Sequence, residues 1–108
     1  MARYTLIASR DPFDSTEHRH YLDLAGDLQA AGHEVTLFLV QNAVLGARPS
    51  EASKPVSALA RKGVTVLADR FSLRERGISP DRLAPEIRAS ELDIVVDHLA
   101  EGRKVLWH

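Results

Sequence analysis

The chain has 108 residues, a formal net charge of −1, 44% hydrophobic residues and 27% charged residues. These values are typical of one globular domain with a single hydrophobic core, so we expect residues 1–108 to form one domain. The near-neutral charge argues against a nucleic-acid partner, because such proteins need a basic excess to neutralise phosphates. No stretch approaches the roughly 20 apolar residues of a membrane-spanning helix, so no membrane association is expected.

The chain contains no cysteine. This excludes disulfides, thiolate metal sites and every cysteine-based mechanism. The apolar run before Asp11 and Pro12 is too short for a signal peptide, so a cytoplasmic location is expected. Walker and dinucleotide-binding glycine patterns are absent as well, and no cofactor is predicted.

The first predicted elements are a strand and a helix. Residues 4–9 (YTLIAS) form a short apolar run that ends before Asp11, which indicates a strand entering a loop. Asp14 and Glu17 have the spacing of a capping box at the start of a helix, and Gly32 is placed to end it. The apolar positions of this helix follow the helical repeat: Tyr21, Leu24, Ala25 and Leu28.

Two further strands and a short helix are predicted in the middle of the chain. Residues 35–40 are apolar on both faces of a pleat except for Thr36, as expected for a central strand between two helical layers. Pro55 suits the first turn of a helix that Gly63 ends. Residues 64–69 (VTVLAD) then form the third strand.

A last helix and a last strand complete the pattern. Ser90, with Asp93 three residues later, has the spacing of a second capping box, and Gly102 is placed to end that helix. Residues 104–108 (KVLWH) are predicted to form the final strand. The predicted buried stripe of the helix consists of Leu92, Val95, Val96 and Leu99.

The alternation of strands and helices through short links indicates an α/β fold. We expect a three-layer α/β/α domain with a mainly parallel sheet of about four or five strands. In such sheets ligands bind at the carboxyl ends of the strands. Four segments are therefore candidates for a site: residues 9–16, 41–43, 69–76 and 107–108.

Five pieces of the chain carry a family resemblance: LIASRDPFDS, AGHEVTLFLVQNAV, KGVTVLAD, RERGI and ELDIVVDHLAEGRKVLWH. In order and spacing they resemble the DsrE/DsrF/DsrH-like sulfur-relay family, which includes the Tus proteins of transfer-RNA thiolation. The resemblance covers nearly the whole chain and implies a DsrE-like fold. It also implies assembly into homo-oligomers or into hetero-oligomers with related subunits, and in active members a cysteine that carries sulfur as a persulfide.

The resemblance places that cysteine upstream of an Arg-Gly-hydrophobic turn like Arg76, Gly77 and Ile78. The equivalent position is Asp69 in one subgroup and Ser72 in another. Neither side chain replaces a thiolate, because a hydroxyl is far less acidic and a carboxylate cannot bond sulfane sulfur. The resemblance therefore favours a non-catalytic subunit, structural or regulatory, associated with sulfur relay.

A small-molecule binding protein is the alternative. The residues predicted to contact an anionic ligand at the strand ends are Arg10, Asn42, Asp69, Arg70, Ser72 and Arg74. Arg70, Arg74 and Arg76 are expected to converge on an anion, since guanidinium groups suit phosphate, sulfate or carboxylate. The same loop is also explained as a solvated ion network with Asp69 and Glu75, or as a partner contact, since Phe71 and Leu73 lie among the arginines.

A cysteine-independent enzyme is a third hypothesis. It would use Asp69, Ser72 and His108, although Phe71 and Leu73 stand where a nucleophile elbow has glycines. A pair of His98 and His108, with Asp69, would make a metal or acid-base site if the last strand brought them together. The five histidines have no ligand spacing, so no metal is predicted.

A surplus of apolar residues favours an oligomer. The helical wheel puts Ile94 away from Leu92 and Leu99, so Ile94 is expected to face solvent in a monomer. More apolar surface is expected than a small monomer usually exposes. The predicted interface residues are Val44, Leu45, Phe71, Leu73, Ile94 and Trp107.

Overall fold

The computed structural model of the chain describes residues 1–13 and 15–108. Five strands form one sheet in the order β4-β3-β2-β1-β5, and every pair of neighbours runs parallel. The strands are β1 Arg3–Ala8, β2 Glu34–Leu39, β3 Thr65–Asp69, β4 Arg88–Ser90 and β5 Lys104–Trp107. The α-helices are α1 Thr16–Ala30, α2 Lys54–Arg61, α3 Arg70–Glu75 and α4 Asp93–Ala100. Three 3₁₀ helices connect them: η1 Gln41–Ala47, η2 Glu51–Ser53 and η3 Pro80–Arg82.

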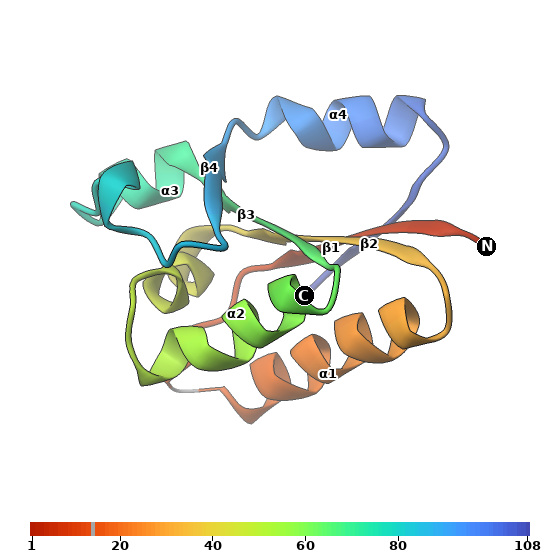
Figure 1. Cartoon of the computed structure of the whole chain (residues 1–108). Coiled ribbons are helices and arrows are strands. Elements are labelled where there is room, and N and C mark those ends of the chain that lie inside the picture. Colours follow the sequence, from red (N-terminus) through yellow and green to blue (C-terminus); the bar gives the residue numbers. More distant parts are fainter. Residues whose placement is uncertain (14) are drawn as a thin grey trace.

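The helices form a layer on each side of the sheet. In Figure 1, α1 and α2 lie below the sheet and α4 lies above it, while α3 follows the end of β3. The predicted three-layer α/β/α fold with a parallel sheet is thereby confirmed. The strands predicted at residues 4–9, 35–40, 64–69 and 104–108 are all present, within one or two residues at each end.

Helix α1 starts and ends through local side-chain and backbone signals. Ser15 is its N-cap, and the Ser15 hydroxyl accepts a hydrogen bond from the backbone N–H of His18 at 3.1 Å. Asp14, the predicted capping-box residue, lies outside the described residues. Gly32 follows the helix with a φ of 94°, a conformation that glycine adopts without strain. Tyr21 and Ala25 are buried as predicted, whereas Leu24 is largely on the surface.

The two faces of the sheet bury unequal amounts of apolar side chain. The main core lies between the sheet and the layer formed by α1, α2 and η1, and contains most of the buried aliphatic residues, Leu6 and Leu37 among them. The second core, under α4, contains only Ile7, Phe38, Val40 and Leu67 among the fully buried apolar residues of the described chain. One helix of eight residues cannot cover five strands, so part of this face stays open.

The structure corrects the predicted start of the last helix. Residues 88–90 form the short strand β4, which pairs with β3, so Ser90 lies in the sheet and does not cap a helix. The N-cap of α4 is Leu92, which makes no side-chain capping bond. A strand of three residues is too short to show an alternating pattern, so its sequence gave no periodic signal.

Helix α4 also meets the sheet with a different face from the one predicted. Ile94 and His98 turn toward the sheet, and the Nδ1 atom of buried His98 lies 2.7 Å from the Thr5 hydroxyl oxygen. Three of the four residues predicted to form the buried stripe are exposed, Leu92 by 51%, Val96 by 64% and Leu99 by 56%, whereas Val95 is partly buried against the second core. The sheet beneath α4 offers buried hydroxyls, and these suit an imidazole better than a leucine side chain.

The buried His98 predicts a pH-dependent stability. Burial, and to a smaller extent Arg103, lowers the pKa of His98 below its ordinary value of 6.5. The unfolded chain therefore takes up this proton at higher pH than the folded chain does. The contribution to stability is complete above pH 6.5 and is lost as the pH falls toward the lowered pKa.

We expect the urea midpoint of the wild type to fall between about pH 7.5 and about pH 5.5, and the midpoint of His98→Asn to fall less. His20→Asn, which changes an exposed histidine of α1, should retain the wild-type decline. Burial also lowers the pKa of His18, so a smaller decline should remain in every variant. An equal decline in wild type and His98→Asn would contradict the assignment to His98.

Candidate functional site

A cleft of about 650 Å³ opens at the carboxyl ends of β2 and β3. We call it the strand-end cleft; it is lined by Val40, Gln41, Asn42, Asp69, Phe71, Ser72, Glu75, Arg76 and Leu92. Its place in the sheet is the one where parallel α/β proteins bind ligands. The structure thus brings together three of the predicted ligand contacts, Asn42, Asp69 and Ser72.

Asp69 and Ser72 form a closed hydrogen-bonded unit in the wall of this cleft. Asp69 is the last residue of β3 and the N-cap of α3, and its Oδ2 atom accepts a bond from the backbone N–H of Ser72 at 3.0 Å. The same oxygen accepts a second bond, at 2.7 Å, from the Ser72 hydroxyl. An aspartate at this position explains why a short helix starts directly at the end of a strand.

The hydroxyl of Ser72 also joins α3 to the turn after β2. Its oxygen accepts a hydrogen bond from the backbone N–H of Gln41 at 2.8 Å. The backbone of Gln41 has a φ of 50°, in the left-handed region that residues other than glycine seldom adopt. Ser72 is 4% exposed and engaged on both sides, so its hydroxyl is a structural bridge.

Arg76, one of the three loop arginines expected to converge on an anion, forms another wall of the cleft. Its Nε and Nη2 atoms donate to Asn42 Oδ1 at 3.2 and 3.0 Å, and its Nη1 donates to the Ser72 carbonyl oxygen at 3.2 Å. Arg76 lies one helical turn after Ser72, which places its guanidinium beside the Ser72 carbonyl. With Asp69 and Glu75 facing a single guanidinium, the charged groups of the cleft lining are mostly acidic.

Three of the predicted anion contacts, Arg10, Arg70 and Arg74, lie outside the strand-end cleft. Arg70 is ion-paired with Glu91 at 3.2 Å. Arg70 and Arg74 both line a separate groove beside η3, whereas Arg10 lines a neighbouring cleft at the start of α1, whose other wall includes Asn42. The strand-end cleft therefore holds none of these three guanidinium groups.

The predicted Asp69, Ser72 and His108 arrangement is not assembled. Strands β3 and β5 are separated by β2 and β1, and three strand spacings amount to about 14 Å. His108 instead places its Nε2 atom 3.2 Å from Glu17 Oε2 and stacks on the Tyr21 ring at 5.2 Å between centroids. Across residues 1–13 and 15–108, no three His, Asp or Glu side chains gather in a way that would hold a metal ion.

The predicted interface residues fall into two groups. Val44 and Leu73 are fully buried in the main core, and Leu45 packs against that core. Ile94 packs against the second core beneath α4. The expected exposure of these four side chains is therefore wrong. The reason for Val44 and Leu45 is that η1 packs onto β2 and β3 as a helix and does not form a surface loop. Phe71 and Trp107 are exposed by 62% and 64%, as predicted.

The sequence did not predict the exposure of a set of apolar residues on α4. Leu92, Val96 and Leu99 form what we call the α4 outer face. Helix α4 packs beside β5, whose Leu106 and Trp107 are exposed as well. The helical repeat revealed this stripe correctly but could not indicate which side of α4 meets the sheet.

The fold and the cleft define a small parallel α/β domain with its candidate site at the strand ends. The chain belongs to the DsrE/DsrF-like family, whose model matches residues 2–108. A search of curated proteins gave no significant match. None of the described helices has the length and apolar content needed to span a membrane.

Solved structures agree in fold over the full chain. MTH1491 of Methanobacterium thermoautotrophicum, a protein of unknown function, is 22% identical with a TM-score of 0.88, and 100% of each chain is covered. The ychN protein of E. coli is 24% identical with a TM-score of 0.86, again with 100% of each chain covered. BT1422 of Bacteroides thetaiotaomicron is 18% identical with a TM-score of 0.81, covering 98% of this chain and 94% of that one. Identities this low establish the shared fold alone.

Proposed function

We propose that this protein is a non-catalytic subunit of a DsrE-like oligomer, with a structural or regulatory role associated with sulfur relay. The observation that carries the proposal is the α4 outer face, whose three aliphatic side chains are all more than half exposed. Small monomeric proteins seldom expose contiguous apolar patches of this kind without a partner. The partner proposed is a second copy of this chain or a related DsrE-like subunit.

The non-catalytic part of the proposal rests on the strand-end cleft. The chain has no cysteine, so it has no thiolate to carry sulfane sulfur. The two residues at the family's cysteine position, Asp69 and Ser72, are bonded to each other, and Ser72 is also bonded to Gln41. A hydroxyl held in this way supports the fold around the cleft and does not favour a nucleophilic role.

Sedimentation velocity of the purified protein tests the assembly. We expect a species larger than 11.9 kDa that persists on dilution from about 100 μM to about 1 μM, the range in which a stable oligomer stays associated. The same experiment repeated with a cysteine-bearing DsrE-like subunit distinguishes a homo-oligomer from a hetero-oligomer. A monomer throughout this range, both alone and in the mixture, would refute the proposal.

Ligand binding in the strand-end cleft is a second candidate function, supported by the volume of the cleft and by its place in the sheet. Its acidic lining works against an anion. We therefore expect that millimolar thiosulfate or AMP does not bind in this cleft and does not raise the melting temperature of the protein. A rise in melting temperature that Arg76→Met abolishes would instead favour the ligand-binding function.

A further inference from the structure

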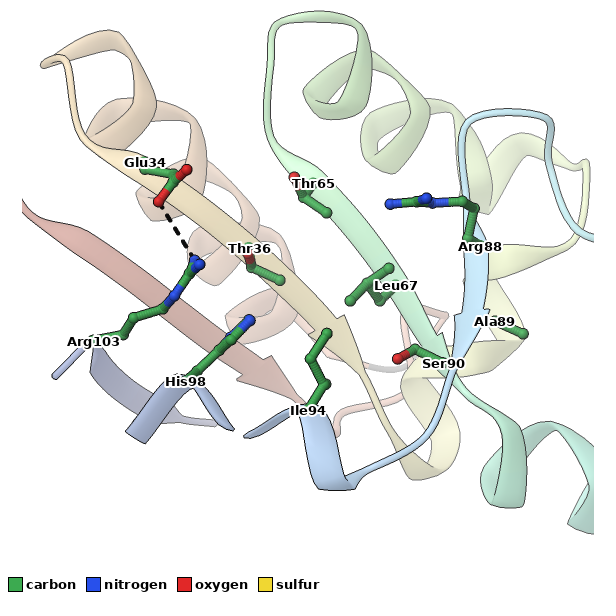
Figure 2. A pocket seen from close by; sticks show the side chains of 10 residues that line it. All are labelled: Glu34, Thr36, Thr65, Leu67, Arg88, Ala89, Ser90, Ile94, His98 and Arg103. Atoms are coloured by element: carbon green, nitrogen blue, oxygen red, sulfur yellow. Dashed lines mark ion pairs between the residues drawn. The ribbon is translucent and has the colours of Figure 1, made fainter. Parts of the chain in front are cut away.

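A second hollow lies on the face of the sheet that α4 leaves partly open. This α4 groove has a volume of about 380 Å³, and Figure 2 shows its side chains coming from β2, β3, β4, the sheet side of α4 and the turn between α4 and β5. It is lined by Glu34, Thr36, Thr65, Leu67, Arg88, Ala89, Ser90, Ile94, His98 and Arg103. The groove is separate from the strand-end cleft, with which it shares no lining residue.

Among the residues that the structure describes, the charges of the groove leave one positive charge without an ion-pair partner. Arg103 is compensated, since it lies 3.5 Å from Glu34 Oε2 and 2.9 Å from Glu101 Oε1. Arg88 forms no ion pair with any carboxylate in the described part of the chain. Figure 2 shows its side chain extending from β4 toward Thr65 of β3, over the open face of the sheet. An uncompensated guanidinium beside a hollow suits a carboxylate, which accepts two parallel hydrogen bonds.

The rest of the lining has an apolar part and a hydrogen-bonding part. Aliphatic surface comes from Ile94, which is partly buried against the second core, and from the edge of Leu67, which is 5% exposed. Thr36, Thr65 and Ser90 supply hydroxyl groups from three adjacent strands. The hydrogen bond between the Thr5 hydroxyl and His98 engages the Nδ1 atom of His98, which leaves its Nε2 atom for a partner outside the sheet. Pockets with an apolar body and a few placed polar groups are typical of small-molecule sites.

We propose that the α4 groove binds a small organic monocarboxylate with an apolar body, whose carboxylate pairs with Arg88. The single uncompensated charge fits a monoanion, and the aliphatic surface of Leu67 and Ile94 fits a carbon skeleton. Inorganic phosphate or sulfate would leave that aliphatic surface uncovered. This binding activity is independent of the proposed assembly role, because the α4 outer face points away from the groove.

The probe for the test is 4-hydroxybenzoate, titrated into the ¹⁵N-labelled full chain and followed by amide chemical shifts. We expect saturable shifts at Thr36, Thr65 and Ser90. Arg88→Met should weaken the binding about tenfold, the effect of losing a charge-assisted hydrogen bond. Arg48→Met is the matched control, because Arg48 is an exposed arginine that lines neither the groove nor the cleft, and it should bind as the wild type does.

Two comparisons make the result decisive. The neutral analogue 4-hydroxybenzyl alcohol should bind the wild type more weakly than 4-hydroxybenzoate does. In Arg88→Met the two compounds should bind with equal affinity. Inorganic phosphate should not compete with 4-hydroxybenzoate. The proposal is overturned by equal affinity in wild type and Arg88→Met, by the absence of saturable shifts at millimolar probe, or by shifts confined to Gln41, Asn42 and Ser72, which would place binding in the strand-end cleft.

Discussion

Replacing Leu99 by glutamate should convert the proposed oligomer into a monomer. Leu99 lies at the end of the α4 outer face and is 56% exposed in the isolated chain, so the substitution leaves the fold of a monomer almost untouched. Within an apolar interface, however, an unpaired carboxylate has to lose its water, at a cost of several kcal/mol. A loss of about 3–4 kcal/mol weakens association by two to three powers of ten.

The control for this experiment is Leu24→Glu. Leu24 is 38% exposed on α1, in the helical layer on the opposite side of the sheet, so the same change of chemistry is made away from α4. Sedimentation velocity should give the wild-type mass for Leu24→Glu and the monomer mass for Leu99→Glu, with unchanged circular dichroism in both. Loss of assembly in Leu24→Glu alone would move the interface to α1 and contradict the role of the α4 outer face.

Replacing Asp69 by alanine should lower the free energy of unfolding by about 2–3 kcal/mol, the combined effect of a lost N-cap and a lost buried hydrogen bond. The carboxylate accepts bonds from both the backbone N–H and the hydroxyl of Ser72, and it is 5% exposed. Without it, the Ser72 hydroxyl has no acceptor and α3 has no cap. Urea unfolding at neutral pH measures the change.

Asp69→Asn is the matched variant, because its amide oxygen still accepts from Ser72 while its charge is gone. The decrease in its free energy of unfolding should be less than half of the decrease caused by Asp69→Ala. Asp27→Ala, an exposed aspartate of α1, should change stability by less than about 0.5 kcal/mol. A similarly small effect of Asp69→Ala would show that the Asp69 and Ser72 unit does not stabilise the fold, and would reopen a chemical role for these residues.

These two residues also show why the site was only partly predictable. The segment VLADRFSLRERGI was correctly placed at the carboxyl end of a parallel strand, because strand-helix alternation is local and the rule for strand ends is general. Which side chains meet at this strand end depends on residues that follow other strands and are distant in the sequence. Gln41 and Asn42 reach Ser72 and Arg76 across more than 30 residues of chain, while Arg70 is drawn away by Glu91.

What the sequence determined by itself was the set of four longer strands, the parallel α/β class and the absence of a thiol at the strand ends. Each follows from local periodicity or from composition. Only the tertiary structure decided which face of α4 meets the sheet, because the contact that orients it joins Thr5 to His98, 93 positions apart. That pairing turns Leu92, Val96 and Leu99 outward and leaves Arg88 beside an open groove, and neither consequence can be read from a helical repeat.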